Sequence, residues 1–173
     1  MKNTLILLFL LLSYICPAQD CDAIIAATHF GKRPYITMNV VNKYIPYDDH
    51  DRKELDTALQ RYMPGNVARQ LLALVHQADT ETICCCTDTS VNFISREYTH
   101  VLAEKYQKLN LSKQGNIAYK YCSLYISKPA IAGDYMLVKY WVVTGRYADF
   151  SIHLFIKRNG QYEEVKVFWG GTT

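Results

Sequence analysis

The C-terminal third of the chain, residues 117–169, constrains the fold most, because it is patterned as a series of antiparallel β-strands. Residues 148–156 alternate large apolar side chains with polar ones, which indicates a strand with one buried face. The dipeptide Asn159-Gly160 follows. It predicts a two-residue type I′ turn, since both central residues of that turn need a positive φ. We therefore expect a β-hairpin that ends near Trp169.

The turn also predicts the register of this hairpin, with Arg158 opposite Gln161. Counting back from that pair gives three apolar pairs on one face: Leu154 with Val165, Ile152 with Val167, and Phe150 with Trp169. A slip of one residue would exchange the two faces of the strand, so the agreement between turn and apolar pattern favours this register.

Residues 135–143 predict the preceding strand, and almost every position is apolar, as in a central strand. The loop near Gly145 leaves the orientation of this strand open. A two-residue loop would turn Lys139 inward together with Trp141. A three-residue loop would instead turn the alternate side chains inward: Met136, Val138, Tyr140 and Val142. We favour the three-residue loop, because it buries no lysine.

The first strand of the series spans 117–126 and places Tyr119, Tyr121 and Tyr125 on one face. Pro129 follows closely. Proline cannot donate to a strand ladder, so this strand lies at an edge or ends in a bulge. With a further turn at 132–134, the C-terminal part is predicted to be a four-stranded antiparallel meander.

Residues 1–18 are predicted to be a signal peptide, because Lys2 precedes a short apolar segment and small residues precede a cleavage site before Gln19. Lipid attachment at Cys16 is the alternative, which the bulky Ile15 disfavours. We therefore expect an exported protein, periplasmic or secreted, without a transmembrane segment in the mature chain. Export permits disulfides, but the pairing of the remaining cysteines stays open: Cys21, Cys84, Cys85, Cys86 and Cys122.

Residues 19–173 suit a single domain, and a composition of 50% hydrophobic and 20% charged residues is typical of a folded chain. The formal net charge of +3 is too small to predict binding to nucleic acid or to an anionic membrane surface. Apolar periodicity predicts helices near 20–30, 52–62, 66–77 and 96–109, whereas 35–45 fits a helix or a strand. The predicted fold class is α+β, with three to four helices packed on one face of a mostly antiparallel sheet.

Two clusters of polar side chains suggest a catalytic alternative. The first is acidic: Asp48, Asp49, His50 and Asp51. Metals favour such ligands, but we interpret the cluster as the start of the helix near 52–62, where carboxylates cap the free N–H groups. The second is a run of thiols: Cys84, Cys85 and Cys86. It lacks a zinc-type spacing and would alternate between strand faces, so we interpret it as core. Neither a metal nor a cofactor is expected, and a hydrolase that uses either cluster is the alternative function.

Three segments carry a family likeness: Ser127-Lys128-Pro129 before a turn, residues 135–140 in a strand, and residues 154–160 in the last hairpin. They follow a helix, a short strand at 82–87 and a helix that opens after Ser95. With this order, residues 67–168 resemble a broad group of exported bacterial α+β proteins of uncharacterised function. The resemblance implies export and an α+β fold with a C-terminal meander, and it supplies no catalytic residues.

Tyrosine is abundant in this chain, with 14 of 173 residues, and an aromatic side chain with a polar end suits a binding surface. We therefore predict a non-enzymatic binding or interaction module that recognises another exported protein or an envelope component. The predicted surface is the aromatic face of the sheet: Tyr119, Tyr121, Tyr125 and Trp141. The alternative is that these side chains pack beneath the helices.

Overall fold

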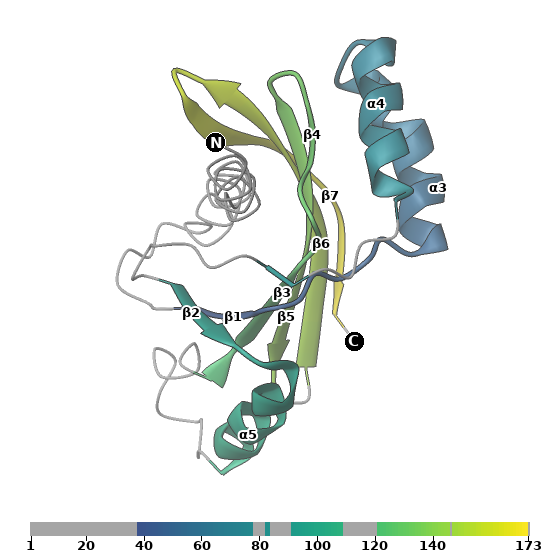
Figure 1. Ribbon diagram of the computed structural model, residues 1–173. Helices are drawn as coiled ribbons and strands as arrows, with labels where there is room; N and C mark the ends of the chain where they lie inside the picture. Colours follow the sequence, from purple (N-terminus) through teal and green to yellow (C-terminus); the bar gives the residue numbers. More distant parts are fainter. Residues whose placement is uncertain (1–37, 78–81, 84–90, 109–120, 146, 173) are drawn as a thin grey trace, which may run out of the picture.

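The computed structural model describes residues 38–77, 82–83, 91–108, 121–145 and 147–172. These residues form an α+β fold with three α-helices and a mixed sheet of seven strands (Figure 1). Several predictions lie outside the described residues: the signal peptide, the helix at 20–30, Tyr119, and the cysteines Cys21, Cys84, Cys85 and Cys86.

The sheet has the strand order β2-β1-β3-β5-β6-β7, and β4 pairs with β5 beside β3. The strands are β1 (Met38–Val41), β2 (Val91–Ile94), β3 (Ser123–Ile126), β4 (Ala130–Ala132), β5 (Tyr135–Thr144), β6 (Tyr147–Arg158) and β7 (Gln161–Thr172). The strands from β3 to β7 pair antiparallel, as the predicted meander requires. In contrast, β1 runs parallel to both β2 and β3, because helical connections return the chain to the same end of the sheet.

The helices begin where the sequence places capping residues. They are α3 (Asp49–Ala58), extended by the short 3₁₀ helix η1 (Leu59–Arg61), then α4 (Gly65–Val75) and α5 (Arg96–Gln107). Asp48 and Asp51 form a capping box at α3, in which each side chain accepts a hydrogen bond from the other residue's backbone N–H. Ser95 caps α5 by accepting from the N–H of Tyr98. Both predicted caps are therefore confirmed.

All three helices pack on one face of the sheet. Buried side chains of α3 and α4 contact Leu137, Leu154 and Phe168. Helix α5 packs through Leu102 on Val41 of β1. The strand registers place Val41 beside Tyr125 of β3 and Trp141 of β5, on the same face as Leu137. Figure 1 shows α3 and α4 together beside the sheet and α5 at its lower end. This placement leaves a stretch of sheet between α5 and the start of α3.

The other face of the sheet also carries buried apolar side chains. Val40, Leu124, Met136, Val138 and Phe155 belong to a second core cluster. The alternation along β5 and β6 assigns them to the face opposite Leu137 and Leu154. Both faces of the central strands are therefore buried, which explains why residues 135–140 read as a continuous apolar run broken only by Lys139.

The last hairpin confirms the predicted turn but corrects the predicted register. Asn159 and Gly160 have φ of 51° and 81°, and Arg158 pairs with Gln161. Two bulges then shift β7 by one residue each, so the predicted apolar pairs are wrong. Their true partners are Leu154 with Lys166, Ile152 with Phe168, and Phe150 with Gly171. A bulge inserts one residue without a partner, and no feature of the turn announces it.

The orientation of β5 is also corrected. Thr144 pairs with Tyr147, so the loop has two residues, and Gly145 adopts the positive φ of 63° that this turn needs. Lys139 consequently points toward the helices and is buried, contrary to the prediction. Of the two alternatives predicted for the strand before Pro129, the edge position is wrong, because β3 lies between β1 and β5. The bulge fits, since residues 127–129 face only two residues of β5 between the pairs Ile126–Tyr140 and Ala130–Leu137. Residues 38–41 form a strand, and β2 was not predicted.

Candidate functional site

A cleft of about 460 Å³ opens on the helical face of the sheet, between the N-terminus of α5 and the N-terminus of α3. Its lining comes from the segment after β1, from the helix starts and from the sheet between them: Val41, Lys43, Tyr44, Ile45, Pro46, Asp48, Arg96, Tyr125, Lys139, Trp141 and Val143. A volume in this range suits a small organic molecule.

The floor of the cleft is an aromatic pair. Tyr125 and Trp141 lie opposite each other in the β3–β5 ladder, with ring centroids 5.9 Å apart and planes tilted by 41°. The hydroxyl of Tyr125 donates to Thr99 Oγ1 of α5 at 3.2 Å, which fixes this ring under the helix. Trp141 has no comparable cover and is 42% exposed. The pair therefore presents one anchored ring and one open ring to a ligand.

A buried ion pair forms the end of the cleft nearest α3. The ammonium group of Lys139 contacts Asp51 Oδ2 and lies 3.0 Å from Asp48 Oδ2. The side chains of Lys139 and Asp51 are only 9% and 2% exposed. Burial acts to raise the pKa of Asp48, but the hydrogen bond from the N–H of Asp51 and the contact with Lys139 outweigh it, so this pKa is lowered. The pair ties the capping box of α3 to the centre of the sheet.

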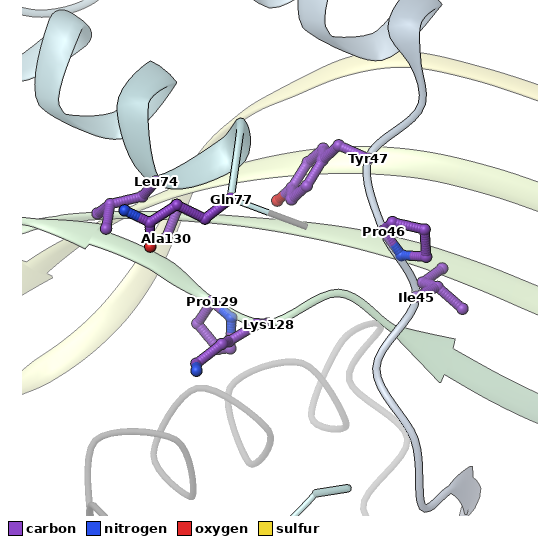
Figure 2. A pocket seen from close by; sticks show the side chains of 8 residues that line it. All are labelled: Ile45, Pro46, Tyr47, Leu74, Gln77, Lys128, Pro129 and Ala130. Atoms are coloured by element: carbon purple, nitrogen blue, oxygen red, sulfur yellow. The ribbon is translucent and has the colours of Figure 1, made fainter. Parts of the chain in front are cut away.

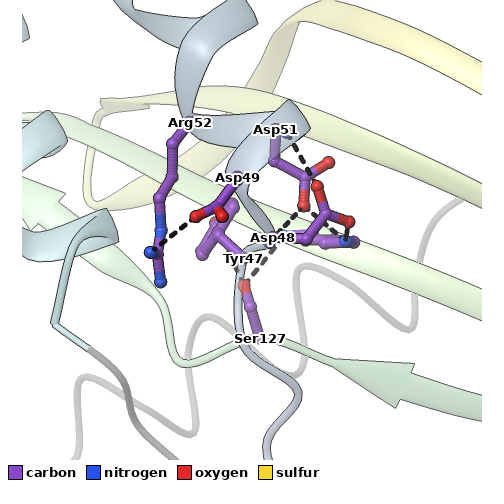
Figure 3. Close-up of polar contacts among 7 residues, drawn as sticks. Tyr47, Asp48, Asp49, Asp51, Arg52 and Ser127 are labelled. Carbon is purple, nitrogen blue, oxygen red and sulfur yellow. Dashed lines mark hydrogen bonds and ion pairs between the residues drawn. The ribbon is translucent and has the colours of Figure 1, made fainter.

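A second set of hydrogen bonds holds the backbone of Lys139. Ser127 Oγ donates to Tyr47 Oη at 3.0 Å and accepts from the N–H of Lys139 at 2.9 Å. The N–H of Ser127 donates to the carbonyl of Lys139 at 2.9 Å. Burial raises the pKa of Tyr47, so its hydroxyl stays neutral. Figure 3 shows Tyr47 and Ser127 beneath Asp48 and Asp51, at the junction of α3 with the sheet.

The rim of the cleft adds two further cations. Arg96 is the first residue of α5 and Lys43 follows β1, and both side chains are exposed. Within the described residues, neither forms an ion pair with a carboxylate. Lys139 is different, since Asp48 and Asp51 already compensate its charge. Hydrogen bonds and the charge of Arg96 together lower the pKa of the neighbouring Glu97, so the charge of Arg96 is balanced in part. The mouth of the cleft thus carries two cations that form no described ion pair.

The structure brings together two of the four predicted binding residues. Tyr125 and Trp141 share the floor of the cleft, whereas Tyr121 packs on the core cluster of Val41, Ile94 and Leu102. Tyr125 also fits the alternative prediction, because it lies beneath α5 while it lines the cleft. Lys43, Arg96 and Lys139 were not predicted as binding residues from the sequence. The only signal for Arg96 was its place directly after the predicted cap Ser95.

The acidic cluster is divided among different tasks. Asp48 and Asp51 cap α3 and contact Lys139, whereas Asp49 is 99% exposed at its side chain and lies 3.4 Å from Arg52 Nη1. His50 is exposed. In the part of the chain that the structure describes, no three His, Cys, Asp or Glu side chains are placed to hold a metal ion. Cys122 Sγ lies 2.9 Å from Thr144 Oγ1, and burial raises the pKa of this thiol.

A second cavity lies where the segment before α3 meets the end of α4, and it measures about 70 Å³. Figure 2 shows Tyr47, Pro46 and Ile45 on one side of it and Lys128, Pro129 and Gln77 on the other. This volume holds a few water molecules at most. The larger cleft is therefore the better candidate for a ligand.

No described helix combines the length and the apolar character needed to cross a membrane. Comparison with family models, with curated proteins and with solved structures finds no match to this chain.

Proposed function

We propose that this chain is an exported binding module, and that the cleft between α3 and α5 is a ligand site without catalytic chemistry. Its ligand is a small anionic molecule with a flat apolar body. The observation that carries the proposal is that one cleft is lined by the exposed Trp141, the anchored Tyr125 and two cations without a described ion pair, Arg96 and Lys43.

Each part of the ligand follows from one part of the cleft. A flat apolar group gains most by stacking on an indole or a phenol ring, and Trp141 leaves 42% of its surface available for this contact. An anionic group is favoured at the rim, since a guanidinium can bind a carboxylate or a phosphate through two parallel hydrogen bonds. The single carboxylate in the lining, Asp48, contacts Lys139, so it opposes an anion less than an isolated carboxylate would.

The polar end of the cleft supports binding more than catalysis. Lys139 and Asp51 are buried together and hold α3 on the sheet, so their contacts already have a structural role. A hydrolase based on the acidic cluster would need a carboxylate or a metal-bound water presented to a substrate. Asp51 is buried against Lys139, and Asp48, although its side chain is 62% exposed in the cleft, already accepts from the N–H of Asp51 and from Lys139.

The test compares two fluorescent probes that differ in charge. Anilinonaphthalene sulfonate carries a flat apolar body and an anionic group, and N-phenylnaphthylamine has a similar body without the charge. We expect the sulfonate to bind more tightly. Trp141→Ala should weaken both probes by about tenfold or more, and Arg96→Gln should weaken only the sulfonate.

Tyr98→Ala is the matched control, because Tyr98 is an exposed aromatic residue of α5 that does not line the cleft. Its affinity for both probes should equal that of the unmodified protein. Equal binding of both probes, or a loss with Tyr98→Ala as large as with Trp141→Ala, would contradict the proposal.

A further inference from the structure

A second polar constellation lies on the opposite face of the sheet from the cleft. Ser151 and His153 are two residues apart on β6, so both side chains point to the same face. His153 Nε2 lies 2.7 Å from Ser151 Oγ, and His153 Nδ1 lies 2.6 Å from Glu164 Oε2 of β7. Both distances are within hydrogen-bond reach, and together they align a hydroxyl, an imidazole and a carboxylate.

The carboxylate decides which nitrogen of the imidazole carries the proton. An ionised Glu164 can only accept a hydrogen bond, so Nδ1 of a neutral His153 must donate to it. Nε2 is then the nitrogen with a free electron pair, and it accepts the hydroxyl proton of Ser151. This is the arrangement in which an imidazole acts as a general base toward a serine and a carboxylate orients the base.

The surroundings fix the imidazole in this orientation. His153 is 2% exposed, and its ring packs against Tyr140 with centroids 4.8 Å apart and against Phe155 with centroids 6.2 Å apart. Burial lowers the pKa of His153, while the contact with Glu164 opposes this shift only in part. The imidazole is therefore neutral at neutral pH, as a base must be. Burial raises the pKa of Tyr140, so this neighbour stays uncharged.

Ser151 is partly exposed although its base is buried. The ladder partner of Ser151 on β7 is Gly170, which has no side chain to cover it. Nearby, Asp149 is exposed and Val167 is 39% exposed, so this part of the sheet face is open to an incoming molecule. One of the two bulges of β7 also falls between Ser151 and Ile152.

We propose that Ser151 is a nucleophile for acyl transfer from small esters, with His153 as its general base and Glu164 as the positioning residue. Ser151 Oγ bonds to the carbonyl carbon of the ester as its proton passes to His153 Nε2. The bond from that carbon to the alcohol oxygen then breaks, and the alcohol leaves with the proton from Nε2. Water hydrolyses the acyl-serine by the same route, which restores Ser151 and releases the acid.

This inference goes beyond the proposed binding function and does not depend on it, because the two sites lie on opposite faces of the sheet. Ser151 lines neither described cavity, so small esters, which need no deep pocket, are the substrate class to test.

The test is covalent labelling of the purified protein with an alkyl fluorophosphonate, which reacts with activated serines and needs no knowledge of the substrate. We expect one label per chain, and peptide mapping should place it on Ser151. Ser95, an exposed serine at a helix start without an imidazole partner, is the internal control and should remain unlabelled. Ser151→Ala should abolish the labelling.

Two glutamate variants separate positioning from folding. Glu164→Gln should slow labelling by about 100-fold, a usual size for loss of general-base assistance, because an amide can turn the imidazole into the wrong tautomer. Glu163→Gln is its matched control on the same strand, because Glu163 points to the opposite face and lies 3.4 Å from the exposed Arg158. It should label at the normal rate. Equal unfolding midpoints of the two variants would exclude a difference in folding.

The pH dependence of the labelling rate distinguishes a general base from a histidine with only a structural role, because only a general base makes the rate depend on its own protonation. The rate should follow the neutral form of His153 and fall at acidic pH, with a midpoint below the usual 6.5 of a histidine. The proposal is overturned if Ser151 stays unlabelled, if the label falls on Ser95 at a similar rate, or if Glu164→Gln and Glu163→Gln react alike. In those cases Ser151 and Glu164 serve only as hydrogen-bond partners of the buried imidazole of His153.

Discussion

The two faces of the sheet each bury a polar network, and the networks differ in how far they reach along the chain. On the helical face, Lys139 contacts Asp48 and Asp51, which lie 91 and 88 residues away in sequence. On the opposite face, His153 contacts Ser151 and Glu164, which are 2 and 11 residues away and belong to one hairpin. The first network joins distant elements, whereas the second forms wherever that hairpin forms.

The two networks also differ in burial, which indicates how much each one contributes to the stability of the fold. Asp51 is 2% exposed at its side chain, so it cannot be solvated if Lys139 is removed, whereas Glu164 is 33% exposed and can turn to water. A buried charge that loses its partner is strongly destabilising, but a half-exposed one is not. The helical network should therefore control stability, and the hairpin network should leave room for chemistry.

The largest expected effect comes from removing the cation of the helical network. Lys139→Met leaves Asp51 buried without its partner and should lower the free energy of unfolding by about 4 kcal/mol. The double variant Lys139→Met, Asp51→Leu removes both charges and should recover a large part of this loss. Urea unfolding of the two variants measures both values. A loss below about 1 kcal/mol for Lys139→Met would mean that the pair is not a tether.

The next effect concerns which side chains of β7 belong to which face. Phe168 is buried opposite Ile152 on the helical face, whereas Val167 lies on the other face and is 39% exposed. Phe168→Ala should therefore cost about 3 kcal/mol and Val167→Ala less than about 1 kcal/mol. A double-mutant cycle should show coupling of Ile152 with Phe168 but not with Val167. The reverse result would restore the register without bulges.

The smallest effect is a pH dependence near the usual histidine range, which the hairpin network should produce, whereas the lowered pKa of Asp48 in the helical network acts at more acidic pH. Burial lowers the pKa of His153, so between the folded and unfolded values the unfolded chain binds more protons. Its contribution to stability is therefore complete above the usual histidine value and is lost as the pH falls through the lowered one. Unfolding free energies across this range should decline for the unmodified protein, and the part due to His153 should vanish in His153→Phe. An unchanged decline in the variant would assign it to other groups.

Local signals in the sequence predicted local structure well. The type I′ turn at Asn159-Gly160 and the caps of Asp48 and Ser95 are confirmed, because each depends on a few neighbouring residues. Interruptions of regular pairing were harder. Pro129 signalled the bulge after β3. The two bulges in β7 fall in a sequence that contains no proline and no other residue that would signal them.

Long-range chemistry could not be predicted from the sequence. Lys139 was expected to stay outside, since a lysine is rarely buried without a partner. Its partners are the same carboxylates that the local pattern had assigned to a helix cap, and only the fold shows that they do both. For the same reason, the aromatic residues of the cleft were predicted and its cations were not. Tyr125 and Trp141 stood out as aromatic residues of neighbouring strands, but Arg96 and Lys43 reach the rim from segments whose placement needs the parallel strands β1 and β2.

The two bulges of β7 have a consequence for how this protein can tolerate changes in length. Each bulge absorbs one extra residue, Val165 or Trp169, and the pairs beyond it keep their faces. Loss of either residue would close the gap and leave the remaining partners in place. Loss of Val167, which is not next to the unpaired Val165, would instead move Lys166 opposite His153 and so transfer its side chain to the other face of the sheet. The last strand thus contains two positions at which evolution can shorten the chain by one residue without refolding it.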